Sequence, residues 1–435
     1  MDTKQLRQKI LDLAIRGKLV PQDPNDEPAS VLLERVKAEK ERLIAEGKIK
    51  RSKKSAASSD KPHYPFEIPN TWVWTTLGEL FILQAGKNIT ADKINYEKND
   101  EYRYPCYGGN GIRGYVVHYN KSGKYPIVGR QGALCGNLNY VEGKFYATEH
   151  AVPVETFAET IPYLAFLFLK QINLNQYATA TAQPGLSVNK ILDVPIPLPP
   201  KEEQARIVQE VLRLEAIVES IETNKEELFK SLSKVKATIL EYAISGKLVQ
   251  QDPSDEPAEV LLKRVNPNAV VSADTSHYQH LPQGWCVCKL EDIVDYEQPQ
   301  RYIVESTEYN DAYKTPVLTA GKSFVIGHTN ETEGVFDKVP VIIFDDFTTD
   351  SKYVDFSFKV KSSAMKILHV KSGVNIKYVY FFMSITRLVG KTHKRYWISE
   401  YSKLVIPLPP YNEQCRIVDA IERINNRIDD IAEAL

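Results

Sequence analysis

Apolar residues recur in alternating steps of four and three between positions 207 and 239 of this 435-residue chain. This seven-residue repeat is typical of a coiled-coil seam, so it predicts one long helix from about Glu202 to Ser245. Lys225 interrupts the seam, and Gly246 is a typical helix stop. The seam positions are Ile207, Val211, Leu214, Val218, Ile221, Leu228, Leu232, Val235 and Ile239.

The same spacing returns at the C-terminus, from Ile417 to Leu435, and another helical stretch opens the chain. A shift of 210 positions places Leu435 on Lys225, and a shift of 229 places Met1 on Lys230. The two terminal stretches therefore match successive parts of the central helix. We expect them to form a second long helix, split between the termini and packed antiparallel to the first, which would bring the two ends of the chain close together.

Two motifs are written twice. "IPLPPKEEQARIV" (196–208) and "IPLPPYNEQCRIV" (406–418) are identical at ten of thirteen positions, and "GKLVPQDPNDEPA" (17–29) returns as "GKLVQQDPSDEPA" (246–258). Trp72 and Trp285 occupy matching places after the second motif. The prolines of the IPLPP junction predict the end of a strand just before a helix. The chain is therefore a tandem duplication, and its split helix makes the repeat circular.

The two blocks between these motifs, roughly 64–198 and 278–408, differ in sequence. Each mixes short strand-like runs with Gly and Pro turns, and each has one late helix, "IPYLAFLFLKQI" or "VNIKYVYFFMSITRLV". We predict an α+β fold: two small mixed α/β globules separated by two long antiparallel coiled-coil helices, with a circular pseudo-twofold repeat. A repeated frame with divergent globules suggests that the globules make the selective contacts.

Composition restricts the class of protein. Hydrophobic residues make up 43% and charged residues 26%, with a net charge of −1, which is ordinary for a globular protein. No apolar run is long enough to span a membrane, and the N-terminus is an amphipathic helix rather than a signal peptide. Five cysteines form neither a disulfide framework nor a zinc spacing. We therefore expect a cytoplasmic protein that does not associate with membranes, while the net charge neither names nor excludes a polyanionic partner.

Four sequence fragments resemble parts of catalytic motifs, and each is incomplete. "LPPY" (408–411) has Leu where an adenine methyltransferase needs Asn or Asp, and "GNGIRG" (109–114) is followed by a strand-like pattern instead of a helix. "AGKS" (320–323) has Pro316 where a phosphate loop needs Gly, and the carboxylates of "DDFTTDSK" (345–352) are spaced too tightly for a metal nuclease. No HExxH pattern occurs. We expect no catalytic site, no metal and no cofactor.

The twice-written "IPLPP..EQ.RIV" and "GKLV.QDP.DEPA", with the alternation of constant helices and variable globules, resemble the specificity subunits of type I restriction–modification systems over the whole chain. The resemblance implies five regions. They are a conserved helical region at 1–62, target recognition domain 1 at 63–200, a central conserved region with the long helix at 201–276, target recognition domain 2 at 277–410 and a conserved C-terminal helix at 411–435.

The same resemblance implies a non-catalytic subunit that recognises DNA. Each globule would read one half of a bipartite site in double-stranded DNA, and the different side chains of the two globules imply that this site is asymmetric. The helices would set the spacer and dock two adenine methyltransferase (modification) subunits, and restriction/translocase subunits would join the full complex. A coiled-coil scaffold, or a specificity module of a modification-only system, stays open as the alternative.

Candidate DNA contacts are polar side chains beside glycines or in turns, because Arg, Lys, Asn, Gln, Ser and Thr read base edges and hold phosphates. In the first globule Arg130 and Gln131 lie between glycines at a predicted strand end. The candidates of the first globule are Lys87, Asn110, Arg113, Arg130 and Gln131. Those of the second are Gln298, Gln300, Arg301, Lys322, Ser323, Thr348, Thr349, Lys394 and Arg395.

Overall fold

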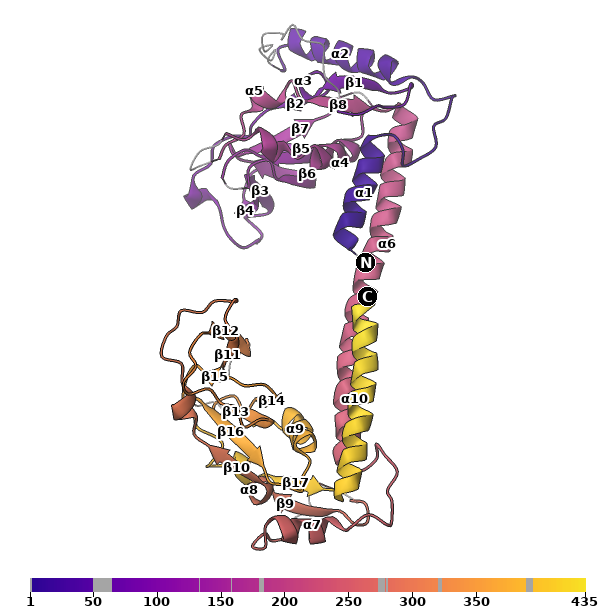
Figure 1. The fold of residues 1–435 in the computed structure, drawn as a ribbon. Helices are drawn as coiled ribbons and strands as arrows, with labels where there is room; N and C mark the ends of the chain where they lie inside the picture. Colours follow the sequence, from indigo (N-terminus) through magenta and orange to yellow (C-terminus); the bar gives the residue numbers. More distant parts are fainter. Residues whose placement is uncertain are drawn as a thin grey trace. The chain divides into compact units, whose positions relative to one another are not determined.

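The computed structural model describes residues 2–49, 65–132, 134–157, 159–179, 184–272, 278, 281–319, 323–388 and 394–435. The chain divides into two compact units, Met1–Asn224 (unit 1) and Lys225–Leu435 (unit 2). The predicted long helix is confirmed as one element, α6 (Lys201–Ile244), whose first part belongs to unit 1 and whose second part belongs to unit 2 (Figure 1).

Unit 1 is built around a six-stranded sheet with the order β2-β7-β5-β6-β3-β4. Its neighbouring strands run antiparallel except β3 and β6, which are parallel. The strands are β2 (Ile82–Leu83), β3 (Tyr104–Gly108), β4 (Gly111–Val116), β5 (Lys121–Gly129), β6 (Leu138–Ala147) and β7 (Ala151–Glu155). The other elements are α1 (Thr3–Ile15), α2 (Ala29–Ala45), α3 (Leu77–Leu80), η1 (Ala91–Lys93), α4 (Pro162–Ile172), η2 (Leu174–Tyr177) and α5 (Val188–Ile191).

Unit 2 replaces that sheet with two smaller ones, of order β10-β16-β13-β14 and β12-β11-β15. The strands are β10 (Val294–Glu297), β11 (Thr315–Leu318), β12 (Val325–Thr329), β13 (Val341–Asp345), β14 (Ser351–Val354), β15 (Lys359–Val360) and β16 (Met365–Val370). The other elements are α7 (Ala258–Val265), α8 (Leu290–Ile293), η3 (Pro299–Tyr302), α9 (Ile376–Ile385), η4 (Tyr401–Lys403) and α10 (Tyr411–Glu433). The late helices predicted in both globules are confirmed as α4 and α9.

Each unit also carries a two-stranded ribbon at its IPLPP junction. In unit 1, β1 (Val73–Thr76) pairs antiparallel with β8 (Pro195–Leu198), and in unit 2, β9 (Cys286–Lys289) pairs with β17 (Val405–Leu408). The prediction that the junction prolines only end a strand is corrected, because Pro197 lies inside β8. A two-stranded ribbon leaves one edge of each strand without a partner, so a residue lacking an N–H is tolerated there.

A helix pair lies at one side of each unit. In unit 1, Ile10 and Ala14 of α1 and Val211 of α6 are buried in one hydrophobic cluster, and Arg7 forms an ion pair of 2.8 Å with Glu222 of α6. In unit 2, α10 packs on the later part of α6, where the Lys236 Nζ lies 2.6 Å from the Asp429 carboxylate. Both pairs are antiparallel, because position 7 contacts 222 and position 22 contacts 203 in unit 1, whereas positions 429 and 435 contact 236 and 225 in unit 2.

Seam residues differ in how far they are covered. Ile207, Val211 and Val218 are fully buried, whereas Leu228 and Val235 are 37% and 46% exposed. The predicted continuous seam is therefore covered in unit 1 and partly open in unit 2.

The N-terminal helix α1 belongs to the helix pair of unit 1, and the C-terminal helix α10 belongs to the helix pair of unit 2. In unit 2, the Lys225 Nζ donates to the Leu435 carbonyl oxygen at 2.7 Å, which agrees with the predicted match of these two positions. Met1 lies outside the described residues, so the expected closeness of the two ends stays a prediction. Among the described helices, none combines the length and the apolar character that crossing a membrane requires.

Candidate functional site

The candidate residues of unit 1 lie at one end of its six-stranded sheet. The Arg130 N–H donates to the His150 carbonyl at 3.0 Å, and the Lys87 N–H donates to the Ala147 carbonyl at 3.0 Å. Asn110 lies in the turn between β3 and β4, and this turn reaches β5 because Gly129 has no side chain: a Cβ there would be 1.8 Å from the Gly109 carbonyl oxygen. The structure therefore brings these segments together, and we call this region the polar end of unit 1.

Side chains at the polar end of unit 1 are open to solvent. Arg130 is half-buried, and the other members, Lys87, Asn110, Arg113 and Gln131, are exposed. Arg113 lies over Gly108, since a Cβ on that glycine would be 2.6 Å from the Arg113 Cδ. Three cations with two amides at one edge can neutralise phosphates and pair with base edges. The "GNGIRG" fragment lies in this β3–β4 hairpin and its two-residue turn.

Sequence reasoning missed two residues at this end. The His150 Nε2 lies 3.2 Å from a Glu149 carboxylate oxygen. The other Glu149 oxygen, Oε2, is buried and has no hydrogen-bond partner in the part of the chain that the structure describes. The adjacent "EH" letters gave no pattern that would have singled these residues out.

In unit 2 the segments that carry Gln298, Thr348, Lys394 and Arg395 meet at one end of the four-stranded sheet. Gln298 follows β10 and Thr348 follows β13, and both strands end opposite the start of β16, because Glu297 pairs with Ile367 and Asp345 with Met365. The segment after Lys394 and Arg395 joins them, since the Trp397 N–H donates to the Asp346 carboxylate at 2.8 Å. We call this region the polar end of unit 2.

Lys366 is the central residue of the polar end of unit 2 and was missed from the sequence. Its Nζ donates to the Gln298 Oε1 at 2.9 Å and lies 3.2 Å from the Asp346 carboxylate. Both charged side chains are almost fully buried, so each depends on the other for compensation of its charge. Because Lys366 holds the amide oxygen of Gln298, the amide nitrogen is left to act as a donor. A lysine inside the apolar run "AMKILHV" was the available signal.

The remaining candidates of unit 2 have different surroundings. Gln300, Arg301, Ser323, Thr348 and Arg395 are exposed. Lys394 is also exposed and forms an ion pair with Glu400. Thr349 is fully buried, and its hydroxyl accepts the Leu388 N–H at 3.1 Å, which gives this threonine a structural contact with the segment after α9. Lys322 lies outside the described residues.

A second, unpredicted arrangement joins the two repeated motifs in unit 1. The buried Glu203 carboxylate accepts hydrogen bonds from the Trp72 Nε1 at 2.9 Å and the Gln22 Nε2 at 2.6 Å. The next residue, Gln204, donates to the Pro199 carbonyl at 3.1 Å and accepts the Ile161 N–H at 3.0 Å. We call this group the node of unit 1. It links the arm after α1, the ribbon, the start of α4 and the start of α6.

Unit 2 contains the same node. Glu413 accepts from the Trp285 Nε1 at 3.0 Å and from the Gln251 Nε2 at 3.0 Å. Gln414 donates to the Pro409 carbonyl at 2.9 Å and accepts the Asn375 N–H at 2.8 Å. Every residue of the node that uses its side chain is identical in the two copies. The twice-written letters Gln, Trp, Glu and Gln are therefore explained by contacts between motifs that lie far apart in the sequence.

An ion pair accompanies each node, and burial affects the glutamates in the same way. Arg206 pairs with Asp26 and Arg416 pairs with Asp255, whose carboxylates are 6% and 4% exposed. Burial raises the pKa of Glu203 and of Glu413 above the usual glutamate value, while the hydrogen bonds from tryptophan and glutamine act in the opposite direction. The nodes are built to hold elements together.

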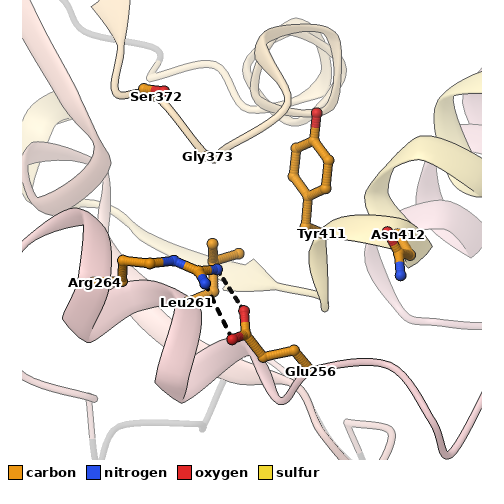
Figure 2. Close-up of a pocket in the computed structure, with 7 residues that line it drawn as sticks. All are labelled: Glu256, Leu261, Arg264, Ser372, Gly373, Tyr411 and Asn412. Carbon is orange, nitrogen blue, oxygen red and sulfur yellow. Dashed lines mark hydrogen bonds and ion pairs between the residues drawn. The ribbon is translucent and has the colours of Figure 1, made fainter.

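A pocket of about 500 Å³ opens beside the node of unit 2 (Figure 2). Arg264 and Glu256 form a two-bond ion pair on one of its sides, the Ser372–Gly373 turn lies on another, and the ring of Tyr411 projects beside it. Leu261 and Asn412 complete the lining. The pocket therefore offers an arginine, a hydroxyl and the first turn of a helix.

A family model and two relatives of this chain all belong to one family of proteins. The family model described as "Type I restriction modification DNA specificity domain" matches residues 69–230 and 282–435. The specificity subunit of the type I restriction enzyme EcoprrI from Escherichia coli is 42% identical over 166 residues, 38% of this chain and 41% of that subunit. The specificity subunit of EcoEI, also from Escherichia coli, is 31% identical over 379 residues, 67% of this chain and 62% of that subunit. The matched stretches thus span less than two thirds of either relative.

A solved structure shares the fold. A chain from a study of complex assembly and conformational transition of the type I restriction–modification system superposes with a TM-score of 0.54 at 17% identity, covering 85% of this chain and 94% of that chain. This likeness supports the arrangement of helices and strands.

Proposed function

Because this chain belongs to the family of type I restriction–modification DNA specificity proteins, we propose that it is the DNA-recognition subunit of such a complex and has no catalytic site of its own. In this proposal unit 1 reads one half of a bipartite site in double-stranded DNA and unit 2 reads the other. The helices set the number of base pairs between the halves.

The observation that carries the proposal is the contrast between nodes and polar ends. The nodes hold both units together with identical residues, so they cannot explain how the two units would select different DNA sequences. The polar ends present different groups: three cations and two amides in unit 1, and a lysine-held glutamine with a threonine and an arginine in unit 2. Different donors and acceptors select different bases. The recognised site is therefore asymmetric.

Exposed apolar residues support a docking role for α6. Leu228, Val235 and Tyr242 are 37%, 46% and 51% exposed and are spaced by seven residues, so they form one row along the helix. An apolar row on a long helix suits packing by helices of another protein. In the proposal the partners are two adenine methyltransferase (modification) subunits, joined by restriction/translocase subunits in the full complex.

The experiment that tests this function is co-expression of the chain with the adenine methyltransferase subunit of the same locus, in a host without adenine methylation, followed by genome-wide mapping of methylated adenines. We expect a bipartite, non-palindromic motif that is methylated only when both proteins are present. The purified chain supplied with S-adenosylmethionine should transfer no methyl group. Methylation by the chain alone, or a palindromic motif, would contradict the proposal.

A further inference from the structure

One turn is built in the same way in both units but carries different side chains. In unit 1 the Thr160 N–H donates to the Phe157 carbonyl at 3.1 Å, and in unit 2 the Val374 N–H donates to the Lys371 carbonyl at 3.1 Å. The residues that follow, Ile161 and Asn375, donate to the two node glutamines. The third position of the turn is therefore Glu159 in unit 1 and Gly373 in unit 2.

In unit 1 the Glu159 carboxylate has two cationic partners. It lies 2.6 Å from the Lys201 Nζ, at the first residue of α6, and 3.5 Å from the Arg35 Nη2. The same Arg35 nitrogen also pairs with Glu27 at 2.7 Å, so one guanidinium serves two carboxylates. Unit 1 thus supplies its own acidic side chain to the space between α2 and the start of α6.

In unit 2 that space is the pocket of Figure 2. The repeat places Arg264 on Arg35 and Glu256 on Glu27, and this ion pair is kept, with an Nη1–Oε1 distance of 3.1 Å. Glu159 is replaced by Gly373, and Lys201 by Tyr411. Gly373 contributes no carboxylate, and the Arg264 side chain remains 61% exposed. The pocket of unit 2 therefore lies where unit 1 holds the Glu159 carboxylate, and unit 2 supplies no carboxylate at that position.

We propose that this pocket receives an Asp or Glu side chain of the methyltransferase subunit docked on unit 2, which rests on the function proposed above. Arg264 binds the incoming carboxylate with the N–H groups that Glu256 leaves unused, so that it pairs with two carboxylates, as Arg35 does with Glu27 and Glu159. Ser372 and the first turn of α10 add donors and a favourable dipole. Unit 1 is closed by its own Glu159, so the two methyltransferase subunits dock through non-identical contacts.

Binding measurements on the full-length chain test this. The chain is titrated with the methyltransferase subunit of its locus, and complexes with one and two copies are resolved by mass photometry. Arg264→Gln and Ser372→Glu should each weaken one of the two binding events about tenfold and leave the other unchanged, as the loss of a charged interface contact or repulsion at it does. Ser372→Glu places an acid in the pocket while keeping the Arg264–Glu256 pair. The matched variant Arg35→Gln, which touches only the internal ion pairs of unit 1, should leave both events unchanged.

A photo-crosslinking amino acid at position 411 gives an independent readout. We expect it to capture a methyltransferase peptide that contains Asp or Glu. A reversed pair, Arg264→Glu with that acid changed to Arg, should restore the binding event that Arg264→Gln weakens. If both events occur with unchanged affinity in Arg264→Gln and Ser372→Glu, or position 411 captures DNA or no methyltransferase peptide, the pocket assignment is wrong while the proposed function stands. If the unaltered chain binds no methyltransferase, the proposed function fails and the pocket assignment fails with it.

Discussion

The nodes of units 1 and 2 and the polar ends of the same units have diverged to very different degrees. The Trp–Glu distance is 2.9 Å in one node and 3.0 Å in the other, and both glutamines bridge a proline carbonyl to the N–H at the start of a helix. The polar ends are built on sheets of different strand number and order. Surfaces that hold the frame tolerate little change because their buried polar groups must stay paired. Surfaces that contact a ligand are free to differ.

Removing the node glutamine should have the largest effect on stability. Gln204→Ala and Gln414→Ala each leave a half-buried N–H and a buried carbonyl unpaired, so each should lower the free energy of unfolding by about 2–4 kcal/mol. Hydrogen exchange should show faster exchange at Ile161 in the first variant and at Asn375 in the second. The control is Gln176→Ala, whose side chain makes an exposed bond, with an expected change within about 0.5 kcal/mol. Unchanged protection at either amide would show that the two nodes are not equivalent.

Removing a side chain that is proposed to contact DNA should have the next largest effect. It should weaken DNA binding and alter recognition of only one half of the target site. Arg130→Ala removes a half-buried cation from the polar end of unit 1, and loss of one base or phosphate contact costs about 1–3 kcal/mol of binding free energy. Fluorescence anisotropy with duplex DNA containing the mapped site should therefore show clearly weaker binding, and sequence preference should relax in one half-site. Gln298→Ala should relax the other half-site. Relaxation of both halves by either variant would contradict independent reading.

The pH dependence of stability should separate the node glutamates from other carboxylates. A carboxyl whose pKa is raised in the folded protein binds its proton more tightly there than in the unfolded chain. Its contribution to stability is therefore complete below the ordinary glutamate pKa and is lost as the pH rises through the raised value. The variant Glu203→Gln with Glu413→Gln should show a flatter fall in free energy of unfolding above about pH 4.5 than the natural chain. Denaturant titrations at several pH values measure this, and parallel profiles would refute it.

The smallest effect is expected from moving the ends of the chain. A short linker from Leu435 to Met1, with new ends between residues 52 and 61, joins stretches that match positions 225 and 230 of one helix, about 7.5 Å apart along its axis. The permuted chain should fold and direct methylation to the same motif. Loss of folding, measured by circular dichroism, would contradict the split-helix interpretation.

Periodicity and repetition in the sequence predicted the frame well. The seven-residue spacing located α6 and its glycine stop, because a long amphipathic helix is a local pattern. The repeated motifs identified the duplicated frame, but the node could not be predicted, since its hydrogen bonds join Gln22, Trp72 and Glu203 across most of unit 1. The identity of the node residues in both copies of the motifs was the one feature of the sequence that pointed to a contact present in both units.

The positions of the candidate residues in the fold were predictable in part, whereas their contact with DNA stays a prediction. Glycines beside Arg130 and Gln131 signalled a close backbone approach, and the structure gathers that group at one end of a sheet. Lys366 escaped notice because a buried lysine needs partners from other strands, which sequence spacing does not reveal. Thr349 was chosen for its polarity, although it is buried and its hydroxyl bonds the Leu388 N–H after α9. Polarity alone does not distinguish a ligand contact from a structural one.

The central claim is that two globules on one duplicated helical scaffold each recognise their own half of the DNA site independently. Exchanging one globule tests this claim most directly. Residues 64–198 are replaced by the corresponding block of a relative with a different target, and methylated adenines are mapped after co-expression with the methyltransferase subunit. The account predicts that one half of the recognised sequence changes to that of the relative, while the other half and the number of base pairs between them stay as in the natural chain. Change in both halves, or in neither, from a folded and active complex would contradict it.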